Sequence, residues 1–507
     1  MRREFECRRD PATNVVVAAA LFFVACAALL VEEACGGEEP VTELSNGFTA
    51  THSADAPGRF EPFLYATNGV FALGFLRVGA SSLDLAVVHL PSSFPLWRAT
   101  PARLADWSRP ATLSFDGRLV LATGPGAGAV LWSTLNVVGD NVKLLNSSEL
   151  IIRLFDERGT PWRSFNSPSD TLVLDQNFTL STPPLISENR RFALRLGKTY
   201  MALHMEFYGG RTRPMYWQHT ALMAQPENGT EPPVYGCLDG RGFFGLYLQG
   251  GSGNESVDRI AFDTFPRNLI GAFRRMTLDD DGNLRAYYWT DGSKDWTSDY
   301  QAISGQCELP TSCGAYGLCV PGQAACQCLV NSTTDGTTSP PCAAVETTDL
   351  CGAGQMFDVV RRSRVSLAYK ERVPFQTYKT VAECEESCAE DCTCWGALYN
   401  GASGYCYLIG FPVETVVYEA DDRKVGYFKV RKAQQSAARA RTMSPGATAA
   451  TVVLSLVLAV AGAYVGYWLW ERRRRRRAGG VGMEQELTPR PYRDLKSMDS
   501  SNNSFKS

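Results

Sequence analysis

Cysteine is the residue type whose number and spacing most directly indicate chemistry in this sequence. The chain has 16 cysteines, and twelve of them lie between Cys307 and Cys406. In an oxidising compartment such density predicts a framework of disulfide bridges. Zinc is the alternative, but the sequence has only 4 histidines and none lies near these cysteines. We therefore predict disulfide bonding, and no metal site, for Cys307, Cys313, Cys319, Cys326, Cys328, Cys342, Cys351, Cys384, Cys388, Cys392, Cys394 and Cys406.

The first six of these cysteines have the spacing C-x5-C-x5-C-x6-C-x-C-x13-C, which resembles that of an EGF-like module. So small a fold cannot bury an adequate core, and its three bridges would each contribute about 3 kcal/mol. The residues before Cys307 read AISGQ and carry no acidic group, so we expect no calcium there.

The other six cysteines predict a helix that bridges tie to a sheet. Cys384 and Cys388 lie in VAECEESCAEDC, where a single helix would put both sulfurs on one face. The stretches CTCWGALYN and GYCYLIG read as strands. Six cysteines allow fifteen pairings, and the sequence does not choose among them. The pairing of Cys35 and Cys237 is also left open.

Asparagine sequons are a second chemical signal. Five have Ser or Thr two places on, with no intervening proline, and we predict N-glycosylation at Asn146, Asn177, Asn228, Asn254 and Asn331. Their use requires that this part of the chain enter the secretory pathway.

Motifs that carry catalysis are missing from the sequence. The stretches GASGY and QGGSGN differ from a G-x-S-x-G nucleophile elbow, and there is no HExxH motif. The glycines of Gly124–Gly128 lead into a strand-like stretch, so they predict a hairpin loop and not a phosphate site. Asp279–Asn283 lacks the spacing of an EF-hand loop and reads as a turn. We predict no enzyme and no cofactor, although carboxylates could still assemble a glycosidase pair.

Two apolar segments predict the topology. Four arginines precede an apolar run from Val15 to Val31, which is typical of a secretory signal peptide cleaved near Ala27 or Ala34. An uncleaved anchor is the alternative. Residues 446–470 are uncharged and long enough to span a bilayer, and Arg472–Arg477 mark their cytoplasmic side. We expect a single-pass type I plasma-membrane protein with its ectodomain outside.

The ectodomain reads as mainly β. Short runs such as FALGFLRV and LDLAVVHL are separated by Gly, Pro and Asp, and no stretch from Val41 to about Phe165 has a convincing helical period. The β pattern returns from about Arg190 to Tyr300, as in RFALRLGKTYMALHMEF. The net charge of −3 argues against a nucleic-acid partner.

The order of these segments resembles the ectodomains of plant S-locus glycoproteins and G-type (bulb-type) lectin receptor-like kinases. The most specific stretch is W-x-S-F-x-x-P-x-D-T-L, matched at Trp162, Ser164, Phe165, Pro168, Asp170, Thr171 and Leu172. CGAYGLC resembles the family's EGF core, and ECEESCAEDCTCWGALYN resembles its PAN/apple module. The likeness is greatest to kinase-less, PAN domain-containing members.

The resemblance implies two tandem bulb-type-lectin-like β-prism domains, an EGF-like module, an α+β PAN/apple module and a single transmembrane helix. The implied ranges are a signal peptide at 1–34, a bulb-type lectin domain at 41–175, an S-locus glycoprotein or second lectin-like domain at 185–300, EGF-like at 303–345, PAN/apple at 351–430, a stalk at 431–445, the transmembrane helix at 446–470 and a cytoplasmic tail at 471–507.

The family's mannose pocket has the pattern Q-x-D-x-N-x-V-x-Y, and this chain departs from it. Two candidate strands lose most of its polar residues. A third keeps Asp281, Asn283 and Tyr287, which are the candidate ligand-binding residues. Turn chemistry plus a core tyrosine would explain the same pattern.

These features predict a receptor-like glycoprotein that binds an extracellular protein, peptide or glycan. No kinase motif is present, and 37 residues follow Trp470. The protein would then act as a co-receptor or decoy, in reach of a receptor kinase in trans, with homo- or heterodimerisation left open. The alternative is a structural, wall-associated glycoprotein whose lectin domains bind no ligand.

Overall fold

The computed structural model describes residues 40–431 and 461–474. Within the first range the exceptions are 100–102, 125–127, 156–158, 199, 221–233, 249–255, 257, 268, 270, 324, 331–341, 343–349 and 352–356. The chain divides into two units, residues 1–432 and 433–507. The predicted signal peptide, Cys35 and most of the predicted stalk and tail lie outside the described residues.

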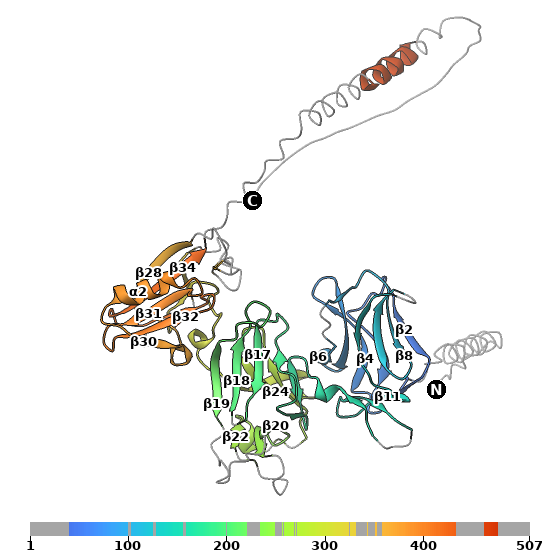
Figure 1. Ribbon diagram of the computed structural model, residues 1–507. Helices are drawn as coiled ribbons and strands as arrows, with labels where there is room; N and C mark the ends of the chain where they lie inside the picture. Colours follow the sequence, from blue (N-terminus) through green and yellow to red (C-terminus); the bar gives the residue numbers. More distant parts are fainter. Residues whose placement is uncertain are drawn as a thin grey trace, which may run out of the picture. The chain divides into compact units, whose positions relative to one another are not determined.

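The described part of the first unit is mainly β, as predicted, and its strands form eight sheets (Figure 1). The first three sheets have the orders β1-β11-β12-β13, β10-β9-β8-β2 and β3-β4-β5-β6, with β7 paired to β5. Their strands are β1 (Glu43–Ser45), β2 (Phe48–His52), β3 (Phe60–Tyr65), β4 (Phe71–Val78), β5 (Ser82–His89), β6 (Phe94–Arg98), β7 (Ala105–Asp106), β8 (Ala111–Phe115), β9 (Leu119–Thr123), β10 (Val130–Ser133), β11 (Asn141–Leu144), β12 (Leu150–Arg153) and β13 (Trp162–Arg163).

Alternation and turn chemistry explain these elements. Strand β8 has the sequence ATLSF and buries every second side chain completely, which is the pattern of a strand with one face on a core. It turns into β9 through Asp116-Gly117, where Gly117 has a φ of 74° that a glycine adopts without strain.

Three further sheets follow, with the orders β14-β23-β24-β25, β15-β20-β21-β22 and β16-β17-β18-β19. Asp279–Asn283 connects β23 to β24 as a turn, with Gly282 at a φ of 86°. The elements are η1 (Ser164–Asn166), β14 (Thr171–Val173), β15 (Asn177–Phe178), β16 (Leu185–Ile186), β17 (Phe192–Leu196), β18 (Tyr200–Met205), β19 (Met215–Thr220), β20 (Val234–Asp239), β21 (Phe243–Leu248), β22 (Asp258–Ala261), η2 (Phe265–Arg267), β23 (Arg274–Leu278), β24 (Leu284–Thr290) and β25 (Asp295–Gln301).

Where it is described, the C-terminal part of the first unit contains two sheets and one α-helix. The sheets have the orders β27-β26-β33-β29 and β28-β34-β31-β32-β30. The elements are η3 (Gln306–Glu308), β26 (Gly317–Cys319), β27 (Gln327–Cys328), β28 (Phe357–Ser363), β29 (Val365–Ser366), η4 (Lys370–Arg372), β30 (Phe375–Thr377), α2 (Val381–Glu390), β31 (Gly396–Asn400), β32 (Tyr405–Ile409), β33 (Val416–Tyr418) and β34 (Lys424–Arg431).

Strand β26 lies in the range predicted as EGF-like, and β33 lies in the range predicted as PAN/apple. The two strands pair in parallel, with Leu318 opposite Val416. The two stretches therefore share a sheet, and the predicted module boundaries stay a prediction.

Six disulfide bridges hold this C-terminal part, which confirms that it is disulfide-rich. The first three cysteine pairs are Cys307–Cys319, Cys313–Cys326 and Cys328–Cys342. The other three are Cys351–Cys392, Cys384–Cys406 and Cys388–Cys394. These bonds choose one of the fifteen pairings that the sequence left open for the second group.

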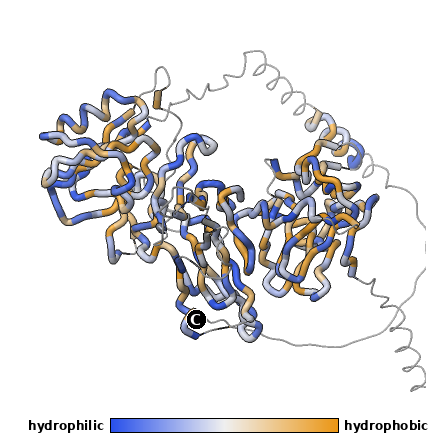
Figure 2. Tube along the Cα trace, turned by 60° about the horizontal axis from the view of Figure 1, so that its bottom comes forward, coloured by the Kyte–Doolittle hydropathy of each residue, from blue (hydrophilic) through white to orange (hydrophobic). Residues whose placement is uncertain are grey.

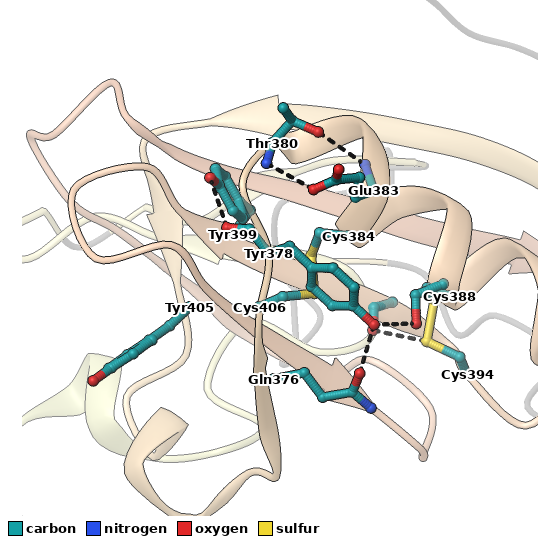
Figure 3. Close-up of a disulfide and its surroundings, with 12 residues drawn as sticks. Gln376, Tyr378, Thr380, Glu383, Cys384, Cys388, Cys394, Tyr399, Tyr405 and Cys406 are labelled. Atoms are coloured by element: carbon teal, nitrogen blue, oxygen red, sulfur yellow. Dashed lines mark hydrogen bonds between the residues drawn. A yellow bond between two sulfur atoms is a disulfide. The ribbon is translucent and has the colours of Figure 1, made fainter.

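Helix α2 is the predicted helix of that second group. Thr380 caps its first turn: the Thr380 hydroxyl accepts from the backbone N–H of Glu383, while the Glu383 carboxylate accepts from the N–H of Thr380 (Figure 3). Cys384 and Cys388 are its buried residues, and the bridge from Cys384 ties the helix to Cys406 of β32 (Figure 3).

Two main hydrophobic cores stabilise the first unit. One is built by the first three sheets, around side chains such as Phe75, Phe115 and Leu85. The other contains residues from the second three sheets and also from the C-terminal part, including Phe192, Leu318 and Phe428. Hydrophobic and hydrophilic residues alternate along many of the strands that surround these cores (Figure 2).

In the second unit, residues 461–474 form a helix. Among the described residues, we find no helix with the length and apolar character needed to cross a membrane. Residues 446–460 of the predicted span lie outside the described part, so the transmembrane helix stays a prediction. The prism arrangement of the sheets stays one as well.

Candidate functional site

A cavity of about 740 Å³ lies beside the first three sheets, between strands β6, β10 and β13 and the segment that follows them. This volume falls within the range of roughly 300–1,000 Å³ that is usual for ligand sites. Its described lining is Val78, Trp97, Arg98, Ala99, Leu104, Trp132, Ser133, Thr134, Leu135, Trp162, Ser167, Pro168, Ser169, Asp170, Pro183, Pro184, Ile186, Ser187, Glu188 and Arg190. We call this cavity the tryptophan pocket.

Three indole rings form the apolar wall of the tryptophan pocket. Trp97, Trp132 and Trp162 come from β6, β10 and β13, which are end strands of three different sheets. Their ring centroids are 5.8, 5.9 and 6.0 Å apart, and all three pairs are edge-on. Edge-to-face packing favours such a cluster because the positive edge of one ring meets the negative face of the next. Trp97 is buried, whereas Trp132 and Trp162 are only half-buried.

Arg98 supplies a buried positive charge that is already neutralised. Its Nε donates to Oδ2 of Asp84 at 3.1 Å, and its Nη1 lies 3.1 Å from Oε1 of Glu188. Asp84 is fully buried on β5, whereas Glu188 is half exposed at the rim. A buried guanidinium needs such partners because desolvation of an unpaired charge is costly.

Asp170 supplies a negative charge of a different kind. Its Oδ1 accepts hydrogen bonds from the hydroxyls of Ser169, at 3.1 Å, and Thr171, at 3.0 Å. Burial raises the pKa of its carboxyl, while these hydroxyls and the nearby charge of Arg98 oppose the rise. The backbone N–H of Asp170 also donates to this carboxyl, and none of the described basic groups forms an ion pair with it.

This set of groups is suited to binding a ligand. The described lining contains hydroxyls but no histidine or cysteine that could act on them as a base or nucleophile. Throughout the described residues, no group of three or more His, Cys, Asp and Glu side chains is arranged to hold a metal ion. Indole surface, hydroxyls and a carboxylate can instead recognise a ligand by packing and hydrogen bonding.

The structure places the predicted ligand-binding residues elsewhere, around the β23–β24 turn. Asn283 is buried, and its amide both donates to the carbonyl of Ile303 at 2.7 Å and accepts from the N–H of Ile303 at 3.0 Å. Asp281 pairs with Arg285 at 2.6 Å. The hydroxyl of Tyr287 donates to Asp279 at 2.8 Å.

Each of these three polar groups therefore has a partner within the protein. A sugar could use Asn283 only if the contact with Ile303 were broken, and a buried group left unpaired costs about 1–3 kcal/mol. Sugar binding by Asp281, Asn283 and Tyr287 stays a prediction that this geometry does not favour.

Two of the predicted glycosylation sites lie in described residues. Asn146 and Asn177 are both exposed. The Oδ1 of Asn146 accepts from the hydroxyl of Thr67 and the N–H of Asn68, both at 3.0 Å, which orients the side chain. Asn228, Asn254 and Asn331 lie outside the described part of the chain, and glycosylation stays a prediction at all five.

Cys237, whose pairing was left open, has a free thiol on β20 and is half-buried. Burial, helped by the negative charges of Asp175 and Asp239, raises the pKa of this thiol to about 12. The thiolate is the reactive form of cysteine, so this residue is a poor nucleophile.

Comparison with known proteins identifies the family. Residues 256–331 match the S-locus glycoprotein domain. A PAN domain-containing protein of Arabidopsis thaliana is 38% identical over 460 residues, covering 90% of this chain and 91% of the relative. The chain belongs to this family of S-locus glycoprotein-like, PAN domain-containing proteins.

More distant members of the family differ in their architecture. A G-type lectin S-receptor-like serine/threonine-protein kinase of Arabidopsis thaliana is 24% identical over 73% of this chain, which spans 46% of that protein. EP1-like glycoprotein 4 of the same plant is 28% identical over 65% of this chain and 77% of the relative.

Among solved structures, the Marasmius oreades lectin aligns with 27% of the chain at 18% identity and a TM-score of 0.19. The two-domain, fetuin-binding agglutinin of Scilla campanulata aligns with 51% of the chain at 14% identity and a TM-score of 0.18. At such TM-scores, neither carries an argument.

Sequence reasoning assigned no ligand role to the tryptophan pocket. Trp162 and Asp170 belong to the W-x-S-F-x-x-P-x-D-T-L stretch, which served only to suggest the family. A usable signal was present in that stretch, because it puts an aromatic ring and a carboxylate near each other in the chain. Trp97 and Trp132 gave no such signal, since only the fold brings them to Trp162.

Proposed function

We propose that this chain is a receptor-like cell-surface glycoprotein that recognises an extracellular protein, peptide or glycan and has no enzymatic activity of its own. The observation that carries the proposal is the tryptophan pocket, whose described lining combines half-buried indole rings, hydroxyls and a carboxylate without a catalytic constellation. Membership of a lectin-like family that includes receptor kinases supports a role in recognition.

The same proposal includes a single transmembrane anchor with the ectodomain outside the cell. The ectodomain would bind the ligand, and the protein would act as a co-receptor or decoy for a receptor kinase in trans. An uncharged segment at 446–470 and the arginine run after it support this topology. The six bridges fit an oxidising environment. Protease added to intact cells should remove the bulk of the chain, and protection of that bulk would contradict the topology.

A pocket-blocking variant tests recognition itself. Ser167 is exposed at the pocket, and its carbonyl accepts from Nε1 of Trp97 at 2.8 Å. Ser167→Tyr keeps that carbonyl and fills the opening with a ring, whereas Ser403→Tyr adds the same ring at an exposed serine of the β31–β32 turn.

Proximity labelling and a glycan array would then compare the full-length glycosylated protein with these two variants. We expect specific partners that Ser167→Tyr loses and Ser403→Tyr retains. Partners that survive in both variants would separate recognition from the tryptophan pocket.

A structural, wall-associated glycoprotein is the second candidate. It is favoured by one observation, the internal pairing of Asp281, Asn283 and Tyr287, since these residues are then occupied by the protein itself. Diffuse retention in the wall, with no partner labelled above background, would support this candidate over recognition.

A further inference from the structure

We propose that the tryptophan pocket binds a basic side chain, Lys or Arg, presented by an extracellular peptide or protein, and that Asp170 is the carboxylate that receives it. The inference deepens the proposed function, because it rests on recognition at this pocket and names the chemistry of the ligand.

Arg98 has ion-pair partners in the pocket, whereas Asp170 has none among the described residues. Arg98 is held by two carboxylates, Asp84 behind the pocket and Glu188 at its rim. Asp170 instead receives hydrogen bonds from two neutral hydroxyls, and both reach the same oxygen. The backbone N–H of Asp170 also donates to this carboxyl. A carboxylate in this position favours a donor that also brings a positive charge.

The two half-buried indoles favour the same ligand. Trp132 and Trp162 line the pocket together with Asp170. A cation close to an indole face is attracted by the negative face of the ring, and more strongly than by other aromatic rings. The long aliphatic stem of Lys or Arg would also pack on the apolar wall, because such stems bury readily while the charged end finds a partner.

An anionic ligand fits the pocket less well. The two cationic groups in its described lining are Arg98, which is already paired, and Arg190, which also has an interaction partner of its own. Glu188 adds a second, half-exposed carboxylate at the rim. An anion would therefore have to displace existing ion pairs, whereas a cation would form an ion pair with the Asp170 carboxylate.

The test compares two peptides that differ only in charge. Acetyl-Gly-Arg-Gly-amide and its neutral isostere acetyl-Gly-citrulline-Gly-amide would be titrated into the full-length glycosylated protein by calorimetry. We expect the arginine peptide to bind at least about tenfold more tightly, a difference of about 1.4 kcal/mol. Raising the salt concentration should narrow this difference.

Two variants locate the effect. Asp170→Asn keeps an acceptor for Ser169 and Thr171 but removes the charge, and it should abolish the preference for arginine over citrulline. Glu188→Gln removes the exposed rim carboxylate and should reduce the preference severalfold, which keeps the test valid if Asp170→Asn does not fold. Glu386→Gln, which removes a carboxylate of α2 outside the pocket, should retain the wild-type preference.

Three outcomes would overturn the inference. Equal binding of both peptides would do so, as would a preference for arginine that survives in Asp170→Asn and Glu188→Gln. Binding of neutral oligosaccharides that Ser167→Tyr blocks, without binding of the arginine peptide, would overturn it while leaving recognition at the pocket intact. If the proposed recognition at the pocket itself were wrong, the Ser167→Tyr variant would lose no partner, and this result is distinguishable from the three above.

Discussion

The three sheets from Glu43 to Arg163 and the C-terminal part from Cys307 to Arg431 are both mostly β, but different forces hold them together. The first three sheets enclose a continuous apolar core, and their described residues contain no disulfide. The C-terminal part has six bridges among its described residues, and one of its clusters consists largely of the cysteines themselves.

This difference shows that the local sequence determines whether a region is stabilised mainly by apolar packing or also by disulfide bridges. In the first three sheets, apolar runs such as β4 and β5 supply enough buried side chains to exclude water from a continuous core. In the C-terminal part, covalent bridges add to the packing by restricting the unfolded chain. Part of its apolar surface joins a core shared with the second three sheets.

Complete reduction of the disulfides should cause the largest loss of structure, and this loss should be confined to the C-terminal part. We expect residues 307–431 to lose structure in a reductant, because each bridge contributes about 2–5 kcal/mol. Residues 43–163 should keep theirs. Hydrogen exchange read by mass spectrometry, with and without reductant, would measure both regions in one sample. Loss of protection at the same reductant concentration in both regions would contradict the comparison.

The double variant Cys384→Ala with Cys406→Ala gives a narrower form of the same test, since it frees α2 from β32. Protection should then fall around α2 first. A matched control is a conservative change at the free thiol, Cys237→Ser, which removes no bridge.

The strands of the first three sheets could be read from sequence because their signals are local. FALGFLRV and LDLAVVHL became β4 and β5, whereas ATLSFDGRLVLAT, which reads as one run, is divided by a turn at Asp116-Gly117 into β8 and β9. Helix α2 was also predictable, since Cys384 and Cys388 are spaced for one helix face.

Long-range features could not be read in this way. Nothing near Leu318 or Val416 indicates that their strands pair. The tryptophan pocket likewise depends on Trp97, Trp132 and Trp162 meeting from three sheets. At Asn283 the sequence instead suggested a feature that the geometry does not favour. Its D-x-N pattern suggested a sugar ligand, but its amide forms hydrogen bonds with the backbone of Ile303.

The next largest effect should come from a core substitution in the first three sheets. Phe75 is 2% exposed and packs 5.2 Å from the ring of Phe63. Phe75→Ala should lower the free energy of unfolding of this region by about 3–5 kcal/mol, because it removes buried surface and leaves a cavity. Reductant should not change that loss. Phe375→Ala, at a ring that is 54% exposed, is the control and should cost far less.

Acid should weaken the first three sheets through His89. This side chain lies within 6 Å of the rings of Phe273 and Trp289, and burial lowers the pKa of its imidazole from 6.5 to about 4, with Asp291 opposing the shift. Between those pH values the unfolded chain binds one proton more than the folded chain. The free energy of unfolding should therefore fall as pH drops from 6.5 to 4, by at most about 3 kcal/mol.

The variant His89→Asn isolates this contribution. Burial raises the pKa of the Asp170, Glu149 and Glu414 carboxyls, so these groups change the free energy of unfolding with pH in the opposite direction to His89. Denaturant unfolding at several pH values should show that the variant loses less stability in acid than the wild type. Parallel pH profiles for the two proteins would show that His89 does not act in this way.

The smallest effect tests whether bridges alone fix the helix of the C-terminal part. Lys429 of β34 is 1% exposed, and its Nζ donates to the carbonyls of Cys388 at 2.7 Å and Asp391 at 2.9 Å. It thus satisfies carbonyls at the end of α2 that have no partner within the helix, and its charge opposes the negative end of the helix dipole. Lys429→Met fills similar space without the charge and should cost about 1–2 kcal/mol even with every bridge intact. Lys379→Met, at an exposed lysine before the helix, is the control. Equal unfolding midpoints for the two variants under oxidising conditions would mean that the disulfides suffice and that the lysine contributes nothing to this end of the helix.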